Sequence, residues 1–279
     1  MKDTETYSRQ TRKMIYVSKD IHGFTLTEIM IALAVAGILF VSIYNLYISQ
    51  SKTYAVQEEI SDMQQNARVA MDILSRHIRM AGFGQPTWTT INGASGIAYK
   101  GIQFIDGGTG NPDTLEIVGC IDPPQGKLST AAPPGSTAVS LQSSYEARRF
   151  NATTKSDIFI GELENAKVTA VSGAVLTVDT DPAQTGNQGF ANAYPAGANI
   201  YRVKRVTYSI RNTSLRRNEN TGGGAQQIAL NIEDLQAGFT RPRVNLSITA
   251  RTRGKDPDYW GDGYHRITLS ADIIARNLE

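Results

Sequence analysis

The sequence predicts an α+β protein in which one long N-terminal helix, membrane-spanning in its first half, packs on an antiparallel β-rich C-terminal head. Three observations lead to this prediction. Residues 29–48 form an apolar run, no Gly or Pro interrupts the helical spacing between Ser49 and Ala81, and from Gln85 the composition changes to Gly, Thr, Ser, Val and Ile. With 279 residues, 41% of them apolar and 19% charged, the chain is ordinary for a folded protein.

The apolar run IMIALAVAGILFVSIYNLYI, residues 29–48, predicts a single membrane span. At about 1.5 Å per residue it covers roughly 30 Å, which is one hydrocarbon thickness. Tyr44 and Tyr47 lie toward its far end, where aromatic side chains favour the interface. The basic residues ahead of the run are Lys2, Arg9, Arg12, Lys13 and Lys19. The positive-inside tendency therefore places the N-terminus in the cytoplasm and everything after about Gln50 outside.

Glu28 is a carboxylate at the front of this apolar helix, and a charge at membrane depth costs roughly 2.5–3.5 kcal/mol unless it has a partner. An ordinary secretory signal cleaved at Ala34 to Ala36 would have Glu28 in the middle of its apolar segment, which argues against that alternative. A plain uncleaved anchor leaves Glu28 unexplained. A cut between Gly23 and Phe24 would create an amine four residues before Glu28, in position to pair with the carboxylate of the same or a neighbouring helix.

The stretch Gly23-Phe24-Thr25-Leu26-Thr27-Glu28, after a basic leader and before an apolar helix, resembles the signal of the type IV prepilin family, which includes the pseudopilins of type II secretion. The resemblance implies that a membrane aspartyl prepilin peptidase cuts after Gly23 and N-methylates Phe24. It also implies that Glu28 neutralises the amine of an adjoining subunit in a filament. Thr27 is a small departure from the family pattern that leaves the cleavage prediction intact.

The helix is expected to run from about Thr25 to Met80, with Gly82 as its C-terminal stop. After the span, a narrow apolar seam consists of Val56, Ile60, Met63, Ala67, Ala70 and Leu74. This seam either packs against the protein's own sheet or coils with helices of other subunits. Gly37, in the middle of the span, either loosens the helix or serves as a small packing residue.

The strands expected after the helix are residues 97–105, 114–121, 137–142, 167–171, 174–179, 200–211, 227–231, 243–253 and 266–276. Alternation such as that from Val244 to Thr249 is typical of an antiparallel sheet with one solvated face. Ser172-Gly173 predicts a tight hairpin turn, and residues 181–189 and 218–224 predict exposed loops. The expected domains are a leader at 1–23, a long helix at 24–81 and a β-rich head at 82–279.

Further segments resemble PilW-type minor pilins, although more loosely than the leader motif does. They are Leu74 to Phe83 at the helix end, Ile232 to Phe239 after a strand, Trp260, and Arg276-Asn277-Leu278. The resemblance implies a large minor pilin rather than a major pilin. The J-type pseudopilin of type II secretion shares this plan and is the close alternative.

No enzyme and no cofactor are expected. His22 lies in the leader, His77 on the helix and His265 near the last strand, and no nucleophile elbow accompanies them. The segment from Thr221 to Gly224 lacks the lysine of a phosphate-binding loop. The single cysteine, Cys120, is expected to be a small buried side chain.

Two weaker sites remain as hypotheses. Asp256, Asp258 and Asp262 lie within one turn and could offer oxygens to calcium, although their spacing is not that of an EF-hand.

Between Arg202 and Arg253 there are ten Lys or Arg residues against three acids, so a basic sheet face with Tyr201 and Tyr208 could touch DNA during uptake. Solvent-facing arginines on strands are the simpler explanation. The net charge of +2 comes entirely from residues before Phe24 and does not favour nucleic acid.

The sequence thus predicts a bacterial inner-membrane precursor with a single span and its head outside the cytoplasm. Its expected partners are the prepilin peptidase, other pilin and minor pilin subunits, and, with less support, DNA or a surface ligand. After processing it would enter a pilus or pseudopilus filament, as a PilW-like minor subunit, a J-type pseudopilin, or a membrane-anchored adhesion or DNA-binding minor pilin.

Overall fold

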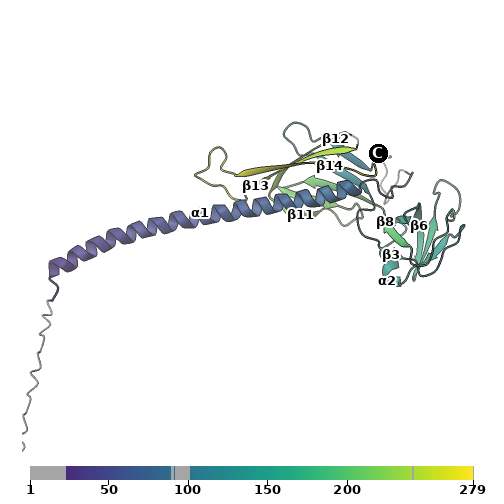
Figure 1. Cartoon of the computed structure of the whole chain (residues 1–279), viewed down its shortest axis with the longest axis horizontal. Helices are drawn as coiled ribbons and strands as arrows, with labels where there is room; N and C mark the ends of the chain where they lie inside the picture. The colour runs from purple at the N-terminus through teal and green to yellow at the C-terminus, as the bar shows by residue number, and fades with distance from the viewer. Residues whose placement is uncertain (1–22, 89–90, 92–100, 241, 279) are drawn as a thin grey trace, which may run out of the picture. The chain divides into compact units, whose positions relative to one another are not determined.

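Helix α1 (Leu26–Met80) is the first element of the computed structural model, which describes residues 23–88, 91, 101–240 and 242–278 (Figure 1). Its 55 residues correspond to an axial length of roughly 80 Å at about 1.5 Å per residue. The predicted helix is confirmed to within one residue at its start. Thr25 stands directly before the first turn, and Gly82, with a φ of +81°, follows the last one, so both ends have the residue types that such ends require.

The chain divides inside α1 into two compact units, the first ending at Tyr54 and the second beginning at Ala55. In the first unit the apolar side chains of the helix are exposed, as shown by Leu33 at 67% and Phe40 at 71%. Such a continuous apolar surface is unfavourable in water and requires lipid or other helices around it. Among the described residues, α1 is the one helix long and apolar enough to cross a membrane.

The strands of the second unit pair antiparallel, which confirms the predicted α+β fold. One sheet has five strands in the order β1-β2-β9-β10-β11, and a second has three in the order β12-β13-β14. Their bounds are β1 Ile102–Ile105, β2 Thr114–Gly119, β9 Lys204–Ile210, β10 Ser214–Asn218, β11 Gln226–Leu230, β12 Ile232–Thr240, β13 Arg243–Arg251 and β14 Arg266–Ile274.

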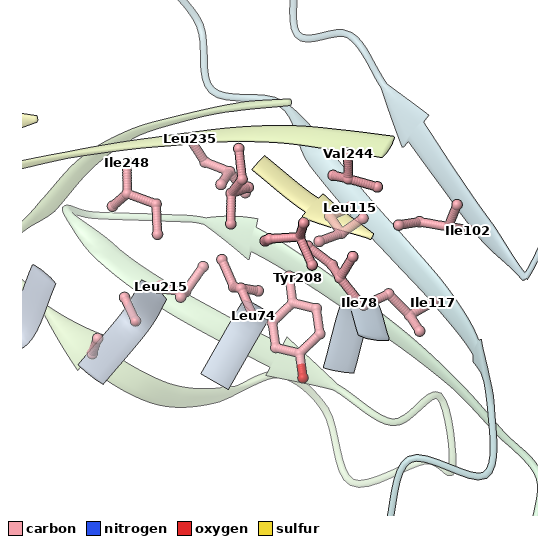
Figure 2. Close-up of a cluster of buried hydrophobic side chains, with 14 of the residues drawn as sticks. Leu74, Ile78, Ile102, Leu115, Ile117, Tyr208, Leu215, Leu235, Val244 and Ile248 are labelled. Carbon is pink, nitrogen blue, oxygen red and sulfur yellow. The ribbon is translucent and has the colours of Figure 1, made fainter. Parts of the chain in front are cut away.

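The second half of α1 and these two sheets share one hydrophobic core. The helix contributes Met63, Ala67, Ala70, Leu74 and Ile78, all 0–3% exposed. Figure 2 shows Leu74 and Ile78 among the side chains of Ile102, Leu115, Ile117, Tyr208, Leu215, Leu235, Val244 and Ile248. Each fully buried Leu or Ile contributes about 1.5–3 kcal/mol to stability. From Ile60 onward, the seam therefore packs against the protein's own sheets, which confirms the first of the two interpretations for that part.

A third sheet forms a lobe inserted between β2 and β9. Its six strands have the order β3-β8-β5-β6-β7-β4, with a short helix, α2 (Ser144–Ala147), beside them. The bounds are β3 Gly126–Lys127, β4 Ala138–Ser140, β5 Asp157–Ile160, β6 Glu164–Ser172, β7 Val175–Asp179 and β8 Asn199–Arg202. The lobe has its own core, which includes Leu128, Ile158, Ile160, Val168, Leu176, Val178 and Ile200. This insertion was not predicted from the sequence.

Several expected strands differ from the observed ones. Residues 200–211 were expected as one strand, but Val203 separates β8 from β9, which belong to different sheets. The hairpin turn between β6 and β7 is present, but because Ser172 pairs with Val175 its central residues are Gly173 and Ala174. Strands β3, β5, β10 and β12 were not expected as strands. Of the first expected strand, residues 97–100 lie outside the described residues, as do leader residues 1–22.

Candidate functional site

The stretch from Gly23 to Glu28 leads into α1 and includes its first helical residues. Phe24 is 84% exposed and Leu26 77%, so neither packs against the folded protein. A Cβ atom added at Gly23 would meet nothing within 4 Å, and the backbone there has no positive φ. The folded chain therefore places no steric requirement for glycine at position 23, and any requirement must come from outside it.

Thr25 and Glu28 cap the helix reciprocally. The backbone N–H of Thr25 donates to Glu28 Oε2 over 2.9 Å, and the N–H of Glu28 donates to Thr25 Oγ1 over 3.3 Å. The hydroxyl of Thr25 also donates to Glu28 Oε2 over 2.9 Å. This is a capping box, in which a Thr-x-x-Glu spacing satisfies two N–H groups that the first helical turn leaves free.

The capping box fixes where the carboxylate of Glu28 lies. Both groups that bond it belong to Thr25, which directly follows Phe24 in the chain. A carboxylate in the first turn is also stabilised by the partial positive charge of the helix N-terminus. The capping role of Thr25 was not predicted, although the Thr-x-x-Glu spacing indicates it.

The calcium hypothesis has no support from the loop that joins β13 and β14. Asp256 Oδ2 lies 2.9 Å from His265 Nε2, and its Oδ1 accepts the N–H of Asp258 over 3.0 Å. Asp262 accepts bonds of 2.8 and 2.6 Å from Arg266, which hold the pKa of that carboxyl far below its ordinary value. No group of three or more His, Cys, Asp or Glu side chains among the described residues is placed to hold a metal ion. These carboxylates stabilise the loop instead.

Five of the nine described basic residues in the expected DNA-binding face are paired with carboxylates. Arg241 lies outside the described residues. Ion pairs join Arg202, Lys204 and Arg217 to Glu219 (2.9, 3.0 and 3.1 Å), Arg205 to Glu116 (3.2 Å) and Arg251 to Glu233 (3.5 Å). The count of three acids missed Glu116 because it lies on β2, far away in the sequence.

Of the two tyrosines of that hypothesis, Tyr208 is not available for stacking on bases. Tyr208 is fully buried, and the hydroxyl of Tyr201 donates to Glu162 over 2.8 Å. Part of the positive charge and one of the two tyrosines are therefore not free to contact DNA.

His77, in the last turn of α1, is buried against Tyr208, to which its Nδ1 is hydrogen-bonded. Burial is the main cause that lowers the pKa of His77 to about 4, and the cations Arg217, Arg76 and Lys204 lower it further against the opposing effect of Asp122. The imidazole is therefore neutral in the folded protein at neutral pH. It acts as a structural hydrogen-bonding group rather than as an acid or base.

This burial predicts a loss of stability in mild acid. Unfolded His77 takes up a proton near its ordinary pKa of 6.5, whereas the folded protein resists protonation down to about pH 4. The unfolded state thus binds more protons, and the free energy of unfolding should fall by about 3 kcal/mol as pH drops through this window. Urea unfolding of the full-length protein in detergent micelles between pH 7 and 5 would measure this slope. In His77→Gln the slope should become clearly shallower, and an unchanged slope would contradict the assignment.

A family model matches the N-terminal part of the chain. The prokaryotic N-terminal methylation motif matches residues 18–44, which include Gly23, Phe24, Thr25 and Glu28. No curated protein and no solved structure matches the chain. The motif is the signal of type IV pilins and pseudopilins, and it implies processing by prepilin peptidase and assembly with other pilins. Together with the exposed apolar helix and the β-rich region, it supports a membrane-anchored type IV pilin-like or pseudopilin subunit.

Proposed function

We propose that this protein is a minor, PilW-like subunit of a type IV pilus that acts in pilus assembly or priming. Prepilin peptidase cuts after Gly23 and N-methylates Phe24, and the mature chain then enters the filament. The observation that carries this proposal is the carboxylate of Glu28, held by Thr25 in the first turn of an exposed apolar helix. An unpaired carboxylate at membrane depth is energetically costly, so its presence there is best explained by a positively charged amine that pairs with it.

Cleavage supplies that amine. Before the cut, the nitrogen of Phe24 is part of a peptide bond and carries no charge. After the cut it is an ammonium directly before Thr25, whose N–H and hydroxyl hold Glu28. The same carboxylate can then serve two roles in sequence: it caps its own helix in the single subunit, and it pairs with the amine of an adjoining subunit in the filament.

The domain boundaries follow from this proposal. Residues 1–23 are the cytoplasmic leader, residues 24–81 the long helix with its span at about 29–48, and residues 82–279 the head outside the cytoplasm. The orientation rests on the basic residues of the leader. The peptidase and the other pilin and minor pilin subunits are then the partners.

Two of the segments that resemble PilW-type pilins lie in contact with each other. The side-chain amide of Asn277 lies 3.4 Å from the carbonyl oxygen of Ala81, and Leu278 fills the space beside Gly82. The end of α1 thus packs directly against the C-terminal segment Arg276-Asn277-Leu278. The J-type pseudopilin alternative predicts the same processing and differs in the filament that the protein enters.

A fractionation experiment separates the two filaments. In the native host, the tagged full-length protein should appear in sheared surface pili, and deletion of its gene should reduce piliation while type II secretion continues. A secretion defect with normal pili would instead establish the pseudopilin alternative.

Replacement of Gly23 by valine should accumulate uncut precursor. The folded chain has open space at this position, so a side chain there does not disturb the protein itself. A defect would therefore report on the peptidase site. Immunoblots of membranes that contain the peptidase would show the larger precursor, while Gly37→Ala, also in open space, should be processed normally. Cleavage of Gly23→Val at an unchanged rate would refute the assignment.

A further inference from the structure

Trp260 lies at the tip of the loop that joins β13 and β14. It is 82% exposed, although tryptophan side chains are usually largely buried because of their apolar area. Exposure alone identifies no partner. The structure of the loop, its place in the head and its charge together identify one.

Several contacts fix the loop and leave the indole outside. The N–H of Asp256 donates to the carbonyl of Gly263 over 2.8 Å, which closes the tip. Asp256 Oδ2 lies 2.9 Å from His265 Nε2, and the ring of Tyr259 packs on this imidazole with the ring centres 3.8 Å apart. The rings of Tyr259 and Trp260 are 5.8 Å apart. The indole is thus presented on a preformed support, so little conformational entropy is lost when it meets a surface.

The loop lies at the end of the head from which α1 continues toward its apolar run. The N–H of Gly254 donates to Glu59 Oε2 over 2.8 Å, whereas beyond the other end of β14 the amide of Asn277 lies 3.4 Å from the carbonyl oxygen of Ala81. The chain covers roughly 33 Å between Glu59 and Ala81, and the nine residues of β14 cover roughly 30 Å. Strand and helix therefore run side by side, with the loop next to Glu59.

Chain length brings this loop within reach of the membrane interface. Glu59 follows Ile48, the last residue of the apolar run, by eleven residues, and a helix of that length covers about 17 Å. The headgroup region accounts for roughly 5–8 Å of this distance. Six residues separate Gly254 from Trp260, and a chain of that length reaches at most about 20 Å. The indole can therefore reach the headgroups.

The charge of the loop suits a lipid surface. Between residues 253 and 266, three carboxylates balance three cationic side chains, which are Arg253, Lys255 and Arg266. A balanced loop is not repelled by headgroups and does not depend on anionic lipid for its attraction. The indole supplies the attraction, because it combines an apolar ring with an N–H that can donate, and this combination concentrates tryptophan at membrane interfaces.

We propose that Trp260 inserts into the headgroup region of the bilayer that α1 spans, as long as the subunit is anchored there. The contact gives the head a second point of attachment, besides α1, and so limits its tilt before the subunit enters a filament. A single indole binds an interface reversibly, so the contact ends when the subunit leaves the membrane. The inference rests on the membrane anchoring in the proposed function and is independent of which filament the protein enters.

Quenching of tryptophan fluorescence in nanodiscs tests the contact. The full-length protein and Trp260→Phe are compared in phosphatidylcholine nanodiscs with and without a nitroxide on the lipid headgroup. The chain has two tryptophans, and the indole of the other, Trp88, donates to Asp157 of the lobe over 2.7 Å. The emission of Trp260 is the difference between the two proteins. The nitroxide should remove about half of it or more, because ring and nitroxide lie at the same depth.

Tyr145→Trp in the Trp260→Phe background is the matched control. Tyr145 is 69% exposed on α2 of the lobe, so this variant carries a similarly accessible indole away from the β13–β14 loop. Both substitutions leave α1 untouched, so all three proteins should enter nanodiscs equally. The indole at position 145 should be quenched at least about twofold less than Trp260, since it has no support that holds it at the interface. Equal quenching of the two indoles, or no quenching of the Trp260 emission, would overturn the proposal.

Discussion

Glu28→Ala will be processed like the wild-type precursor and will be lost from filaments. The substitution leaves Gly23 and Phe24 in place, so cleavage continues. It removes the carboxylate that would pair with the amine of Phe24 in an adjoining subunit. An unpaired charge at membrane depth costs roughly 2.5–3.5 kcal/mol, and each 1.4 kcal/mol is a factor of ten in an equilibrium, so incorporation should fall at least about tenfold. Immunoblots of sheared filaments and of membranes measure incorporation and processing separately.

Two companion variants separate charge from helix capping. Glu28→Gln keeps an oxygen that can accept the N–H of Thr25 but has no charge, whereas Thr25→Val keeps the charge and removes the hydroxyl. If the charge is what matters, Glu28→Gln should assemble as poorly as Glu28→Ala, and Thr25→Val should assemble much better. Normal incorporation of Glu28→Gln would show that Glu28 acts only as a helix cap.

Gly82→Ala is expected to destabilise the head by about 3–5 kcal/mol, from left-handed backbone strain and overpacking together. Gly82 ends α1 with a φ of +81°, which L side chains rarely adopt. Its added Cβ would lie 2.6 Å from Leu278 Cδ2 and 2.9 Å from the backbone oxygen of Asn277. The leucine side chain can move, but the backbone oxygen of Asn277 cannot do so without disturbing the packing of the C-terminal segment against the end of α1. Urea unfolding of the full-length protein in detergent micelles measures the effect.

Gly110→Ala isolates the contribution of the close contacts. Gly110 has the same φ of +81°, but a Cβ there would meet nothing within 4 Å. It should therefore show only the cost of the left-handed backbone, about 1–2 kcal/mol. If the two variants lose equal stability, the contact between the helix end and the C-terminus contributes nothing and the packing argument is wrong.

The helix could be predicted from the sequence because its signals are local. An uninterrupted apolar run, an apolar seam at helical spacing and a glycine after the last turn all act within a few residues of one another. The six-residue stretch from Gly23 to Glu28 is local in the same sense. The resemblance of this stretch to the prepilin signal agrees with the motif match over residues 18–44. The capping role of Thr25 was not predicted, although the Thr-x-x-Glu spacing indicates it.

Strand order and ion pairs could not be predicted because they depend on residues far apart in the chain. β5 is buried at all four positions, so it lacks the alternation by which strands were sought. β10, with the sequence SLRRN, has a single large apolar residue, Leu215, and its pairing with β9 and β11 makes it a strand. Likewise, the pairing of Arg205 could not be predicted because its partner, Glu116, belongs to a strand that is nearly ninety residues earlier.

The inserted lobe has a consequence for how the chain can vary. β2 and β9 are hydrogen-bonded neighbours in the five-stranded sheet, and Gly119 pairs with Lys204. The chain therefore leaves this sheet for the lobe and returns to it at two points about one strand spacing apart. In topological terms the lobe is the loop of a β2–β9 hairpin. A small hydrophobic cluster that includes Val118, Phe159 and Val203 packs the lobe against the five-stranded sheet. Loops of this kind tolerate length changes at low entropic cost. The length and sequence of the lobe can therefore change while the strand register of the five-stranded sheet and the packing of α1 stay the same.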